Sequence, residues 1–411
     1  MAFEQGLSGL SAATKNLDVI GNNVANVSTI GFKQSTAHFA DVYATAGGLV
    51  GDKTAGIGTR VSAVAQSFSQ GSLTATSNPL DFAINGSGFF RLSNNGTVEY
   101  SRNGQFQLDK SGYIVNDNGD RLTGYPAGPN GILPTASPTD LQISQADVDP
   151  NATTKVSATV GLDSRAAAIT TTFDPTDSTT YNFATSTSVY DSLGNSHALA
   201  TYYVPKGQDA NGDNQWAVYA TNDGVAVGTG PVGTIKFGTD GLVDTANTTT
   251  PFSVSTAVGG GAVSPLAFTL DYAGSTQFGT ASGVNQLTQD GFTSGRLSSY
   301  SVSDDGIILG RYSNGQTKAL AQVALANFTS PEGLASLGNN TWAESSKSGP
   351  PLVGAPGTAS LGALQSGTVE ESNVDLTAEL VNMITAQRNY QANAQTIKTE
   401  DALMQTLVSL R

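Results

Sequence analysis

A few short segments of this 411-residue chain contain residue types that carry out chemistry in other proteins. Residues 228–233 read Gly-Thr-Gly-Pro-Val-Gly and match GxGxxG, a pattern that binds dinucleotides only between a strand and a helix. A proline interrupts the pattern and the β-prone segment 234–237 follows it, so we favour a β-turn. Residues 209–213 resemble the start of a calcium loop, but Asn214 and Ala220 stand where that loop needs glycine and glutamate. We interpret this segment as a solvated turn, with a weak cation site as the alternative.

The two histidines, His38 and His197, are each isolated in polar sequence. Neither has a second histidine at metal-ligand spacing or an evident nucleophile partner, so we interpret both as surface or interface residues. The acidic pair Asp304-Asp305 precedes Gly306, as in a hairpin turn. The sequence leaves a glycosidase pair of carboxylates open, because two such acids can lie far apart in the chain. We predict no catalytic, metal-binding or cofactor-binding residue, and no cofactor.

Composition narrows the fold and the partners. A chain of 411 residues is too long for one ordinary core, and 47 glycines with only 13% charged residues are typical of β-rich domains with frequent turns. The absence of cysteine excludes disulfides and thiolate chemistry. A net charge of −14 argues against nucleic acid or an anionic membrane as partner. The chain shows no apolar run of membrane-spanning length, and its first residues lack the features of a cleavable signal peptide.

The charge is concentrated in the middle of the chain. Residues 1–71 carry four basic and four acidic side chains, and residues 362–411 carry three and six. Residues 72–361 carry twelve basic and twenty-three acidic side chains. Near-neutral ends can pack closely against copies of themselves, whereas an acidic middle stays solvated and repels non-specific contacts.

Both ends of the chain have the four–three spacing of a coiled-coil seam. The N-terminal segment contains several glycines and asparagines, so a lone helix there is marginal in water and needs a partner. At the other end Ser372 is the predicted N-cap of a long helix. We expect the two helices to pair as a coiled coil. The seam positions are Phe3, Leu7, Leu10, Thr14, Leu17, Gly21 and Val24 at the N-terminus, and Leu376, Leu380, Met383, Gln387, Tyr390, Ala394, Ile397, Asp401, Met404 and Val408 at the C-terminus.

Between the helices the pattern changes to the period of two that β-strands show. The composition shifts to Thr, Ser and Ala near residue 146, and strand patterns like the earlier ones resume after residue 284. We therefore predict a multidomain, mainly β protein with a nested layout. Its expected parts are a terminal helical domain (1–25 and 366–411), an extended bracing segment (26–71 and 362–365), an inner β domain (72–145 and 285–361) and an outer inserted β domain (146–284).

Several segments near the ends resemble the rod and hook family of flagellar axial proteins. The segment 23–33 (NVANVSTIGFK) is similar to the family's N-terminal signature. Residues 77–90, 100–116 and 121–127 resemble the inner β domain of that family, and residues 324–345 and 371–411 resemble its tail. The match covers about the outer two thirds of the chain. The large inserted domain favours a hook-type member, with a shorter, distal-rod-like member as the alternative.

The resemblance implies a non-enzymatic subunit that polymerises into a tube transmitting motor torque. It implies contacts with copies of itself, a rod protein, a hook cap, a hook–filament junction protein and the flagellar type III export apparatus, and a location in the extracellular flagellum reached without a cleavable signal peptide. A secreted β-rich adhesin or hydrolase is the competing class. To the apolar seam positions the expected self-assembly interface adds four residues of the signature segment: Asn23, Asn26, Gly31 and Phe32.

Overall fold

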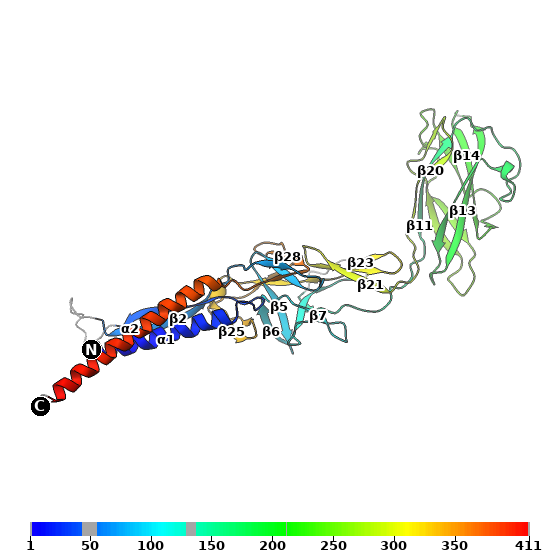
Figure 1. The fold of residues 1–411 in the computed structure, drawn as a ribbon. Helices are drawn as coiled ribbons and strands as arrows, with labels where there is room; N and C mark the ends of the chain where they lie inside the picture. The colour runs from blue at the N-terminus through cyan, green and yellow to red at the C-terminus, as the bar shows by residue number, and fades with distance from the viewer. Residues whose placement is uncertain (1, 43–55, 129–136, 211, 410–411) are drawn as a thin grey trace. The chain divides into compact units, whose positions relative to one another are not determined.

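The computed structural model describes residues 2–42, 56–128, 137–210 and 212–409. It is mainly β, with one long helix near each end of the chain: α1 (Ala2–Ala25) and α2 (Leu376–Ser409) (Figure 1). The chain folds into two compact units. Unit 1 comprises Met1–Gln145, Ser299–Arg311 and Thr317–Arg411, and unit 2 comprises Ala146–Ser298 and Tyr312–Gln316.

Most strands of unit 1 belong to one sheet. Along its main path the strand order is β21-β22-β23-β9-β5-β6-β26-β25, so neighbours in the sheet are often far apart in the chain. Its core holds an aromatic cluster of Phe89, Tyr100, Phe328 and Trp342. The strands of this unit are β1 (Ser35–Val42), β2 (Gly58–Gln66), β3 (Leu73–Ala75), β4 (Phe82–Asn85), β5 (Phe89–Asn94), β6 (Thr97–Ser101), β7 (Gln107–Leu108), β8 (Ile114–Val115), β9 (Arg121–Pro126), β10 (Thr139–Asp140), β21 (Leu297–Val302), β22 (Ile307–Tyr312), β23 (Thr317–Val323), β24 (Leu325–Asn327), β25 (Ala335–Gly338), β26 (Thr341–Ala343), β27 (Leu352–Gly354), β28 (Ala363–Ser366) and β29 (Thr368–Glu370).

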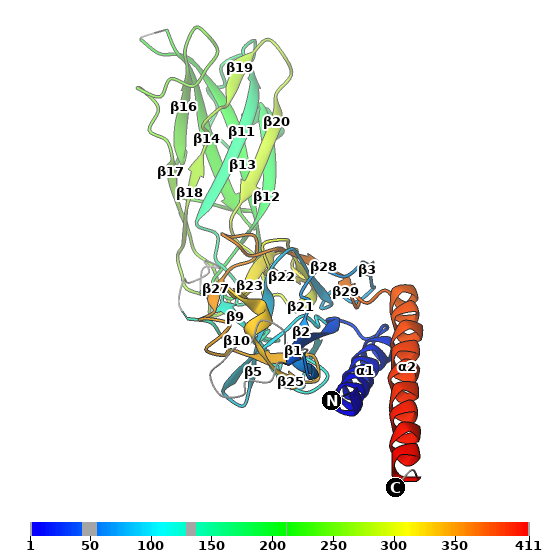
Figure 2. The ribbon, with the colours of Figure 1, turned by 90° about the vertical axis from the view of Figure 1, so that its left-hand side faces the viewer.

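Unit 2 is a sandwich of two five-stranded sheets (Figure 2). One sheet has the order β17-β18-β11-β19 with β20 also on β11, and the other has β12-β13-β14-β15 with β16 also on β14. Alternate residues of β11 and β13 point into one apolar core that contains Tyr203, Trp216 and Tyr272, as the period-two pattern predicts. The strands are β11 (Lys155–Asp163), β12 (Phe183–Tyr190), β13 (Ser196–Gln208), β14 (Asn214–Asn222), β15 (Val225–Ala226), β16 (Gly233–Phe237), β17 (Phe252–Thr256), β18 (Leu266–Asp271), β19 (Thr276–Phe278) and β20 (Gly283–Gln289).

Unit 2 continues past the boundary expected at residue 284. Strand β20 spans that boundary and pairs antiparallel with β11, from Val156 opposite Gln289 to Gly161 opposite Gly283. Its residues are mostly polar and partly exposed, so their composition did not reveal which sheet they join. The pairing partner, rather than a change in composition, places this strand in unit 2.

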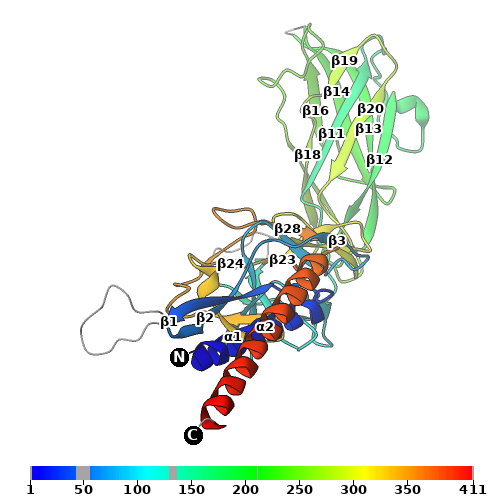
Figure 3. The ribbon, with the colours of Figure 1, turned by 60° about the vertical axis from the view of Figure 1, so that its left-hand side comes forward.

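The expected bracing segment 26–71 contains an antiparallel β-hairpin. Strand β1 pairs with β2 from Ser35 opposite Gln66 to Val42 opposite Gly58, and the hairpin lies beside α1 (Figure 3). At the other end of the chain, residues 363–370 form β28 and β29, which pair with β4 and β3. The expected start of the helical domain at residue 366 was therefore too early, because these residues complete sheets before α2 begins.

The N-cap of α2 is Asp375, not Ser372. The Asp375 carboxylate accepts hydrogen bonds from the backbone N–H groups of Thr377 at 2.8 Å and Ala378 at 3.1 Å. Ser372 accepts only a bond from Val374 in the preceding turn. Both residue types suit an N-cap, and the position of β29 decides where the helix can start.

We expect unit 2 to fold as a fragment spanning residues 146–298. That fragment should unfold cooperatively in urea, because it contains both sheets and their shared core. A fragment ending at residue 284 should unfold at lower urea concentration, because it lacks most of β20 and exposes the edge of β11. Equal midpoints for the two fragments would contradict the assignment of β20 to unit 2.

His197, interpreted from sequence as an isolated residue, lies between two carboxylates in unit 2. Its Nδ1 is 2.7 Å from Asp223 Oδ2, and its Nε2 is 3.3 Å from Asp191 Oδ2. Burial opposes the imidazolium, but the two carboxylates outweigh it and raise the pKa of His197. Asp191 is buried as well, yet hydrogen bonds from Asn195, Leu193 and His197 lower its pKa to about 2.

This raised histidine pKa predicts a pH dependence of stability. The contribution of the charged His197 is fully present below about pH 6.5 and is lost as the pH rises through its folded pKa. The melting temperature of the 146–298 fragment should therefore fall over that range, beyond any drift seen in H197Q. Identical pH profiles for wild type and H197Q would show that the histidine does not stabilise unit 2 through its charge.

Candidate self-assembly interface

The two terminal helices pack against each other in antiparallel orientation (Figure 2). Gly6 of α1 lies against Ile397, and Gly9 lies against Asn393. A Cβ on Gly6 would stand 3.0 Å from Ile397 Cγ1, and a Cβ on Gly9 only 2.7 Å from Asn393 Oδ1. The glycines that weaken α1 as an isolated helix thus permit its close contact with α2.

The contact line on α1 has the predicted four–three spacing but is displaced by one residue. It runs through Gly6, Gly9, Ala13, Asn16, Ile20 and Asn23, each one position before a predicted seam residue. On α2 the fully buried residues are Glu379 and Ala386, with Asn393 and Ile397 partly buried further along. Pairing of the helices is thus as predicted, but on α1 it does not use the predicted seam positions. The α1 side of the contact consists of glycine, alanine and asparagine residues with Ile20, and on α2 the predicted seam residue Ile397 packs against Gly6.

Most of the predicted seam residues of both helices share a different face of the pair; Ile397, which lies against Gly6, is an exception. An α-helix turns by about 100° per residue. On each helix, the residues that line a groove against β1 lie to one side of the contact line, and the predicted seam lies to the other side. The seam residues of α1 and α2 therefore lie together on the face turned away from β1. We call this the seam face; it contains Phe3, Leu7, Leu10, Leu17 and Val24 of α1 and Leu376, Leu380, Met383 and Ala394 of α2.

The seam face is poorly covered within one chain. Leu7 is 52% exposed and Leu380 is 44% exposed, with similar values at Phe3 and Leu376. Leu10, Leu17, Val24, Met383, Ala394 and Ile397 are partly buried. Tyr390, Met404 and Val408 of α2 are also exposed. Large apolar side chains gathered on one face at this exposure mark a surface for interaction with another molecule.

The signature residues after α1 hold the chain reversal rather than an exposed surface. The Asn23 side chain is buried and exchanges two hydrogen bonds with the backbone of Ser35, at 2.8 and 2.9 Å. The Asn26 side chain accepts a bond from the Thr29 hydroxyl at 3.2 Å. Gly31 has a φ of 71°, and a Cβ there would stand 2.5 Å from the backbone nitrogen of Asn103. The structure thus gives Asn23 and Gly31 intramolecular roles.

Phe32, the fourth signature residue of the expected interface, is also buried within the chain, and Asn26 is partly buried. These two residues and Gly31 lie in the turn that leads into the buried Lys33. The seam face and the signature segment are therefore separate features, one exposed and the other mostly internal.

A buried charged centre joins four distant segments of unit 1. The Glu370 carboxylate accepts hydrogen bonds from Lys33 Nζ at 2.6 Å, Arg102 Nη1 at 3.1 Å and the backbone N–H of Gly71 at 2.9 Å. The Glu370 carbonyl accepts a bond from Gly31 N at 2.8 Å. All three charged side chains are almost fully buried. Burial lowers the pKa of Lys33 and of Arg102, and the Glu370 carboxylate opposes both shifts.

Polar contacts extend from this centre to the start of α2. The backbone N–H of Gln34 donates to Asn373 Oδ1 at 2.7 Å, and its side-chain amide donates to Glu379 Oε1 at 2.6 Å. Asn373 in turn donates to the backbone oxygens of Ser67 and Ser69. Sequence analysis missed all of these partners. The polar residues involved are separated by up to 345 positions, and no local pattern connects them.

The structure shows what surrounds the two segments that resembled dinucleotide-binding and calcium-binding motifs. The GxGxxG segment leads into β16 rather than a helix. Asp209 accepts a hydrogen bond from Lys236 Nζ at 3.0 Å, which places a cation at the calcium-like turn. Within the described parts of the chain, no cluster of three or more His, Cys, Asp or Glu residues is placed to hold a metal ion. Neither helix, over its described residues, combines the length and apolarity that a membrane span requires.

Four family descriptions match successive parts of the chain. They are "Flagella basal body rod protein" at residues 3–33, "Flagellar hook protein FlgE/F/G D1 domain" at 83–161, "Flagellar basal body protein FlaE D2 domain" at 161–292 and "Flagellar basal body rod FlgEFG protein C-terminal" at 365–410. The order of these matches agrees with terminal helices around nested β domains.

Curated relatives match along their full length. The flagellar hook protein FlgE of Escherichia coli (strain K12) is 45% identical over 420 residues, covering 100% of both chains. FlgE of Salmonella typhimurium is 43% identical over 421 residues, again with 100% of both chains covered. FlgE of Borreliella burgdorferi is 33% identical over 440 residues, covering 99% of this chain and 98% of that one.

A solved structure shares the fold. The crystal structure of Helicobacter pylori flagellar hook protein FlgE2 superposes with a TM-score of 0.52 at 14% identity, covering 71% of this chain and 99% of that chain. Together with the four family matches, paired terminal helices with β domains between them place the chain in the class of axial structural proteins of the bacterial flagellum. Within that class, the relatives that match along their full length are hook proteins. The chain belongs to the flagellar hook protein FlgE family.

The charged centre can be tested by removing one charge. E370Q keeps the shape of the side chain but leaves Lys33 and Arg102 buried without a counter-charge, so we expect it to lower the free energy of unfolding of unit 1 by about 3–5 kcal/mol. E371Q is the control, because the exposed Glu371 carboxylate only accepts a bond from Thr74. It should change stability by less than about 0.5 kcal/mol. Urea unfolding that ranked the two variants as equal would contradict the role of Glu370.

Proposed function

We propose that this chain is the structural subunit of the bacterial flagellar hook and assembles through its terminal helices into a curved, flexible tube. In that role the tube carries motor torque from the rod to the filament. The observation that carries the proposal is the seam face, where both helices leave large apolar side chains exposed. Full-length similarity to flagellar hook proteins supports the same function.

The seam face provides the main driving force for assembly in this proposal. A growing tube needs contacts between two different patches, because identical patches would close into a dimer. Burying the exposed leucine and phenylalanine side chains against a neighbouring copy is favourable, mainly through the hydrophobic effect. Three further predicted seam residues of α2, Tyr390, Met404 and Val408, are exposed and extend this surface toward the end of the helix.

The β parts have supporting roles. The hairpin of β1 and β2 lies against α1 and, with the rest of segment 26–71, braces neighbouring subunits between the helices and the inner β domain. The inner β domain and the acidic outer domain stay outside the helical core of the tube. Weak polar contacts between outer domains let subunits slide during bending while the helical core holds.

The function implies further partners and a route of export. We propose that the tube joins a rod protein at its base and a hook–filament junction protein at its tip, and grows beneath a hook cap. The subunit leaves the cell through the flagellar export apparatus without a cleavable signal peptide and acts in the extracellular part of the flagellum. It has no enzymatic activity in this proposal. A distal-rod-like role is the alternative within the family, since rod proteins share the terminal matches.

Assembly distinguishes this function from a secreted adhesin or hydrolase. Purified protein under assembly conditions should form long tubes visible by negative-stain electron microscopy, with curvature typical of a hook rather than a straight rod. Monomeric or dimeric protein at every concentration would contradict a polymerising function.

The seam face is tested by L380D. The aspartate should leave the monomer intact, because Leu380 is 44% exposed, but it places a charge in the proposed interface. A cost on the order of 3 kcal/mol per subunit raises the critical concentration for assembly by at least about 100-fold. V225D makes the same kind of change at a residue of unit 2 that is 71% exposed, and it should assemble nearly as wild type. Sedimentation, which separates polymer from monomer, measures the critical concentration of both variants. Normal assembly of L380D would show that the interface lies elsewhere.

A further inference from the structure

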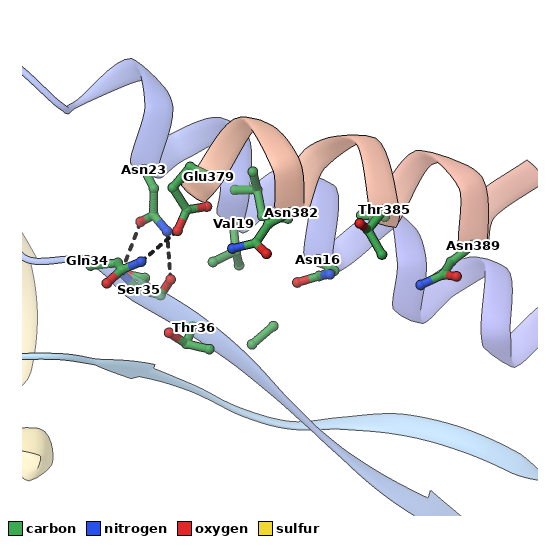
Figure 4. Close-up of a pocket in the computed structure, with 13 residues that line it drawn as sticks. Asn16, Val19, Asn23, Gln34, Ser35, Thr36, Glu379, Asn382, Thr385 and Asn389 are labelled. Atoms are coloured by element: carbon green, nitrogen blue, oxygen red, sulfur yellow. Dashed lines mark hydrogen bonds between the residues drawn. The ribbon is translucent and has the colours of Figure 1, made fainter. Parts of the chain in front are cut away.

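A polar pocket lies between the helix pair and strand β1 (Figure 4). Its volume is about 270 Å³. Asn16, Val19 and Asn23 of α1 form one wall, Gln34–Ala37 form a second, and α2 contributes Glu379, Asn382, Thr385, Ala386 and Asn389. It lies on the side of the helix pair opposite the seam face, so the proposed hydrophobic contact leaves it open.

Glu379 places an unused hydrogen-bond acceptor at this pocket. The residue is only 2% exposed, and its Oε1 accepts the bond from Gln34 Nε2 at 2.6 Å. Oε2 is buried and has no hydrogen-bond partner among the described residues. Figure 4 shows the carboxylate beside Asn23 and Asn382. A buried carboxylate oxygen without a donor is unfavourable, so the pocket favours a group that brings one.

The remaining groups of the pocket define the chemistry of that donor. Apart from Glu379, the polar lining residues are neutral amides and hydroxyls, and none of the lining residues is basic. Amide and hydroxyl oxygens can accept further N–H groups beside the carboxylate. The exposed residues Asn382, Thr385 and Asn389 lie on the α2 side of the pocket. The pocket therefore suits a cation with several N–H donors, entering past α2.

Arg388 is a matching cation on the same helix. Along the described residues of α1 and α2, Arg388 and Lys398 have no carboxylate within ion-pair distance, whereas Lys15 pairs with Asp18. Arg388 belongs to the stretch of α2 that lines the pocket; it is exposed and lies about 200° around the helix from the buried Ala386. Lys398 lies about 15 Å further along the axis. The guanidinium fork also fits a carboxylate better than an ammonium group does.

We propose that the Glu379 pocket receives the Arg388 guanidinium of a neighbouring copy of this chain. The inference rests on the proposed self-assembly of the chain through its terminal helices. Each subunit then offers two different patches, the exposed Arg388 on α2 and the Glu379 pocket between the helix pair and β1, and a contact between them can repeat around a tube. Pairing completes the hydrogen bonds of Glu379 only in the polymer, and it adds a directional contact to the non-directional apolar seam face.

A double-mutant cycle on assembly tests the contact. E379Q retains the acceptor for Gln34 and removes the charge, and R388Q removes the donor from an exposed position. Each should raise the critical concentration about 10-fold, and the double variant should raise it no further than the larger single effect. R388K should lie between wild type and R388Q. K398Q, which removes an unpaired charge from the same helix, should change it less than about 2-fold.

Several outcomes would overturn the proposal. Wild-type assembly by R388Q, effects that multiply in the double variant, or an equal effect of K398Q would each show that the two groups do not pair. Thermal melting of the monomeric variants shows whether E379Q has a folding defect. If it has one, R388Q and R388K test the contact, because Arg388 is exposed. Failure of this contact is distinguishable from failure of the proposed function: in the first case wild type polymerises and L380D does not, and in the second wild type forms no tubes.

Discussion

The buried carboxylate of Glu370 lies where the chain's two ends meet the inner β domain. Lys33 follows the turn after α1, Arg102 follows β6, Gly71 precedes β3, and Glu370 ends β29 shortly before α2. Three buried charged groups in contact tolerate little displacement, because separating any of them would leave a charge without compensation in a low-dielectric environment. This centre therefore fixes the end of α1 and the start of α2 relative to the sheet of unit 1. The pairing of α1 with α2, and the faces that they present, depend on these two positions.

The helix pair meets two opposing requirements. A subunit needs a defined pairing of its ends, yet it must keep apolar surface free for its neighbours. Glycine and alanine at the contact line of α1 allow the backbones of α1 and α2 to approach closely while most of the large apolar side chains stay out of the contact. The leucines and phenylalanine remain on the seam face, and the polar pocket with Glu379 remains on the opposite side. One pair of helices thus carries two surfaces of different chemistry.

The packing of unit 2 does not depend on the charged centre or on the helix pair. Its two sheets enclose their own core, and the buried Asp191 finds its partners, including His197, within the unit. Its surface can therefore change without affecting the charged centre or the helix pair. Such separation suits a protein that must hold one set of contacts while others rearrange.

The sequence by itself determined the elements and their nesting. Heptad spacing identified both helices and the period of two identified the strands, because each of these signals is local. It could not determine the contact face of α1, since two four–three patterns one residue apart both exist and the glycine-containing one looked unfavourable. Nor could it assign β20 to unit 2 or bring Lys33 to Glu370, which are 337 positions apart. Those outcomes depend on which surfaces exclude water together, and only the tertiary structure decided them.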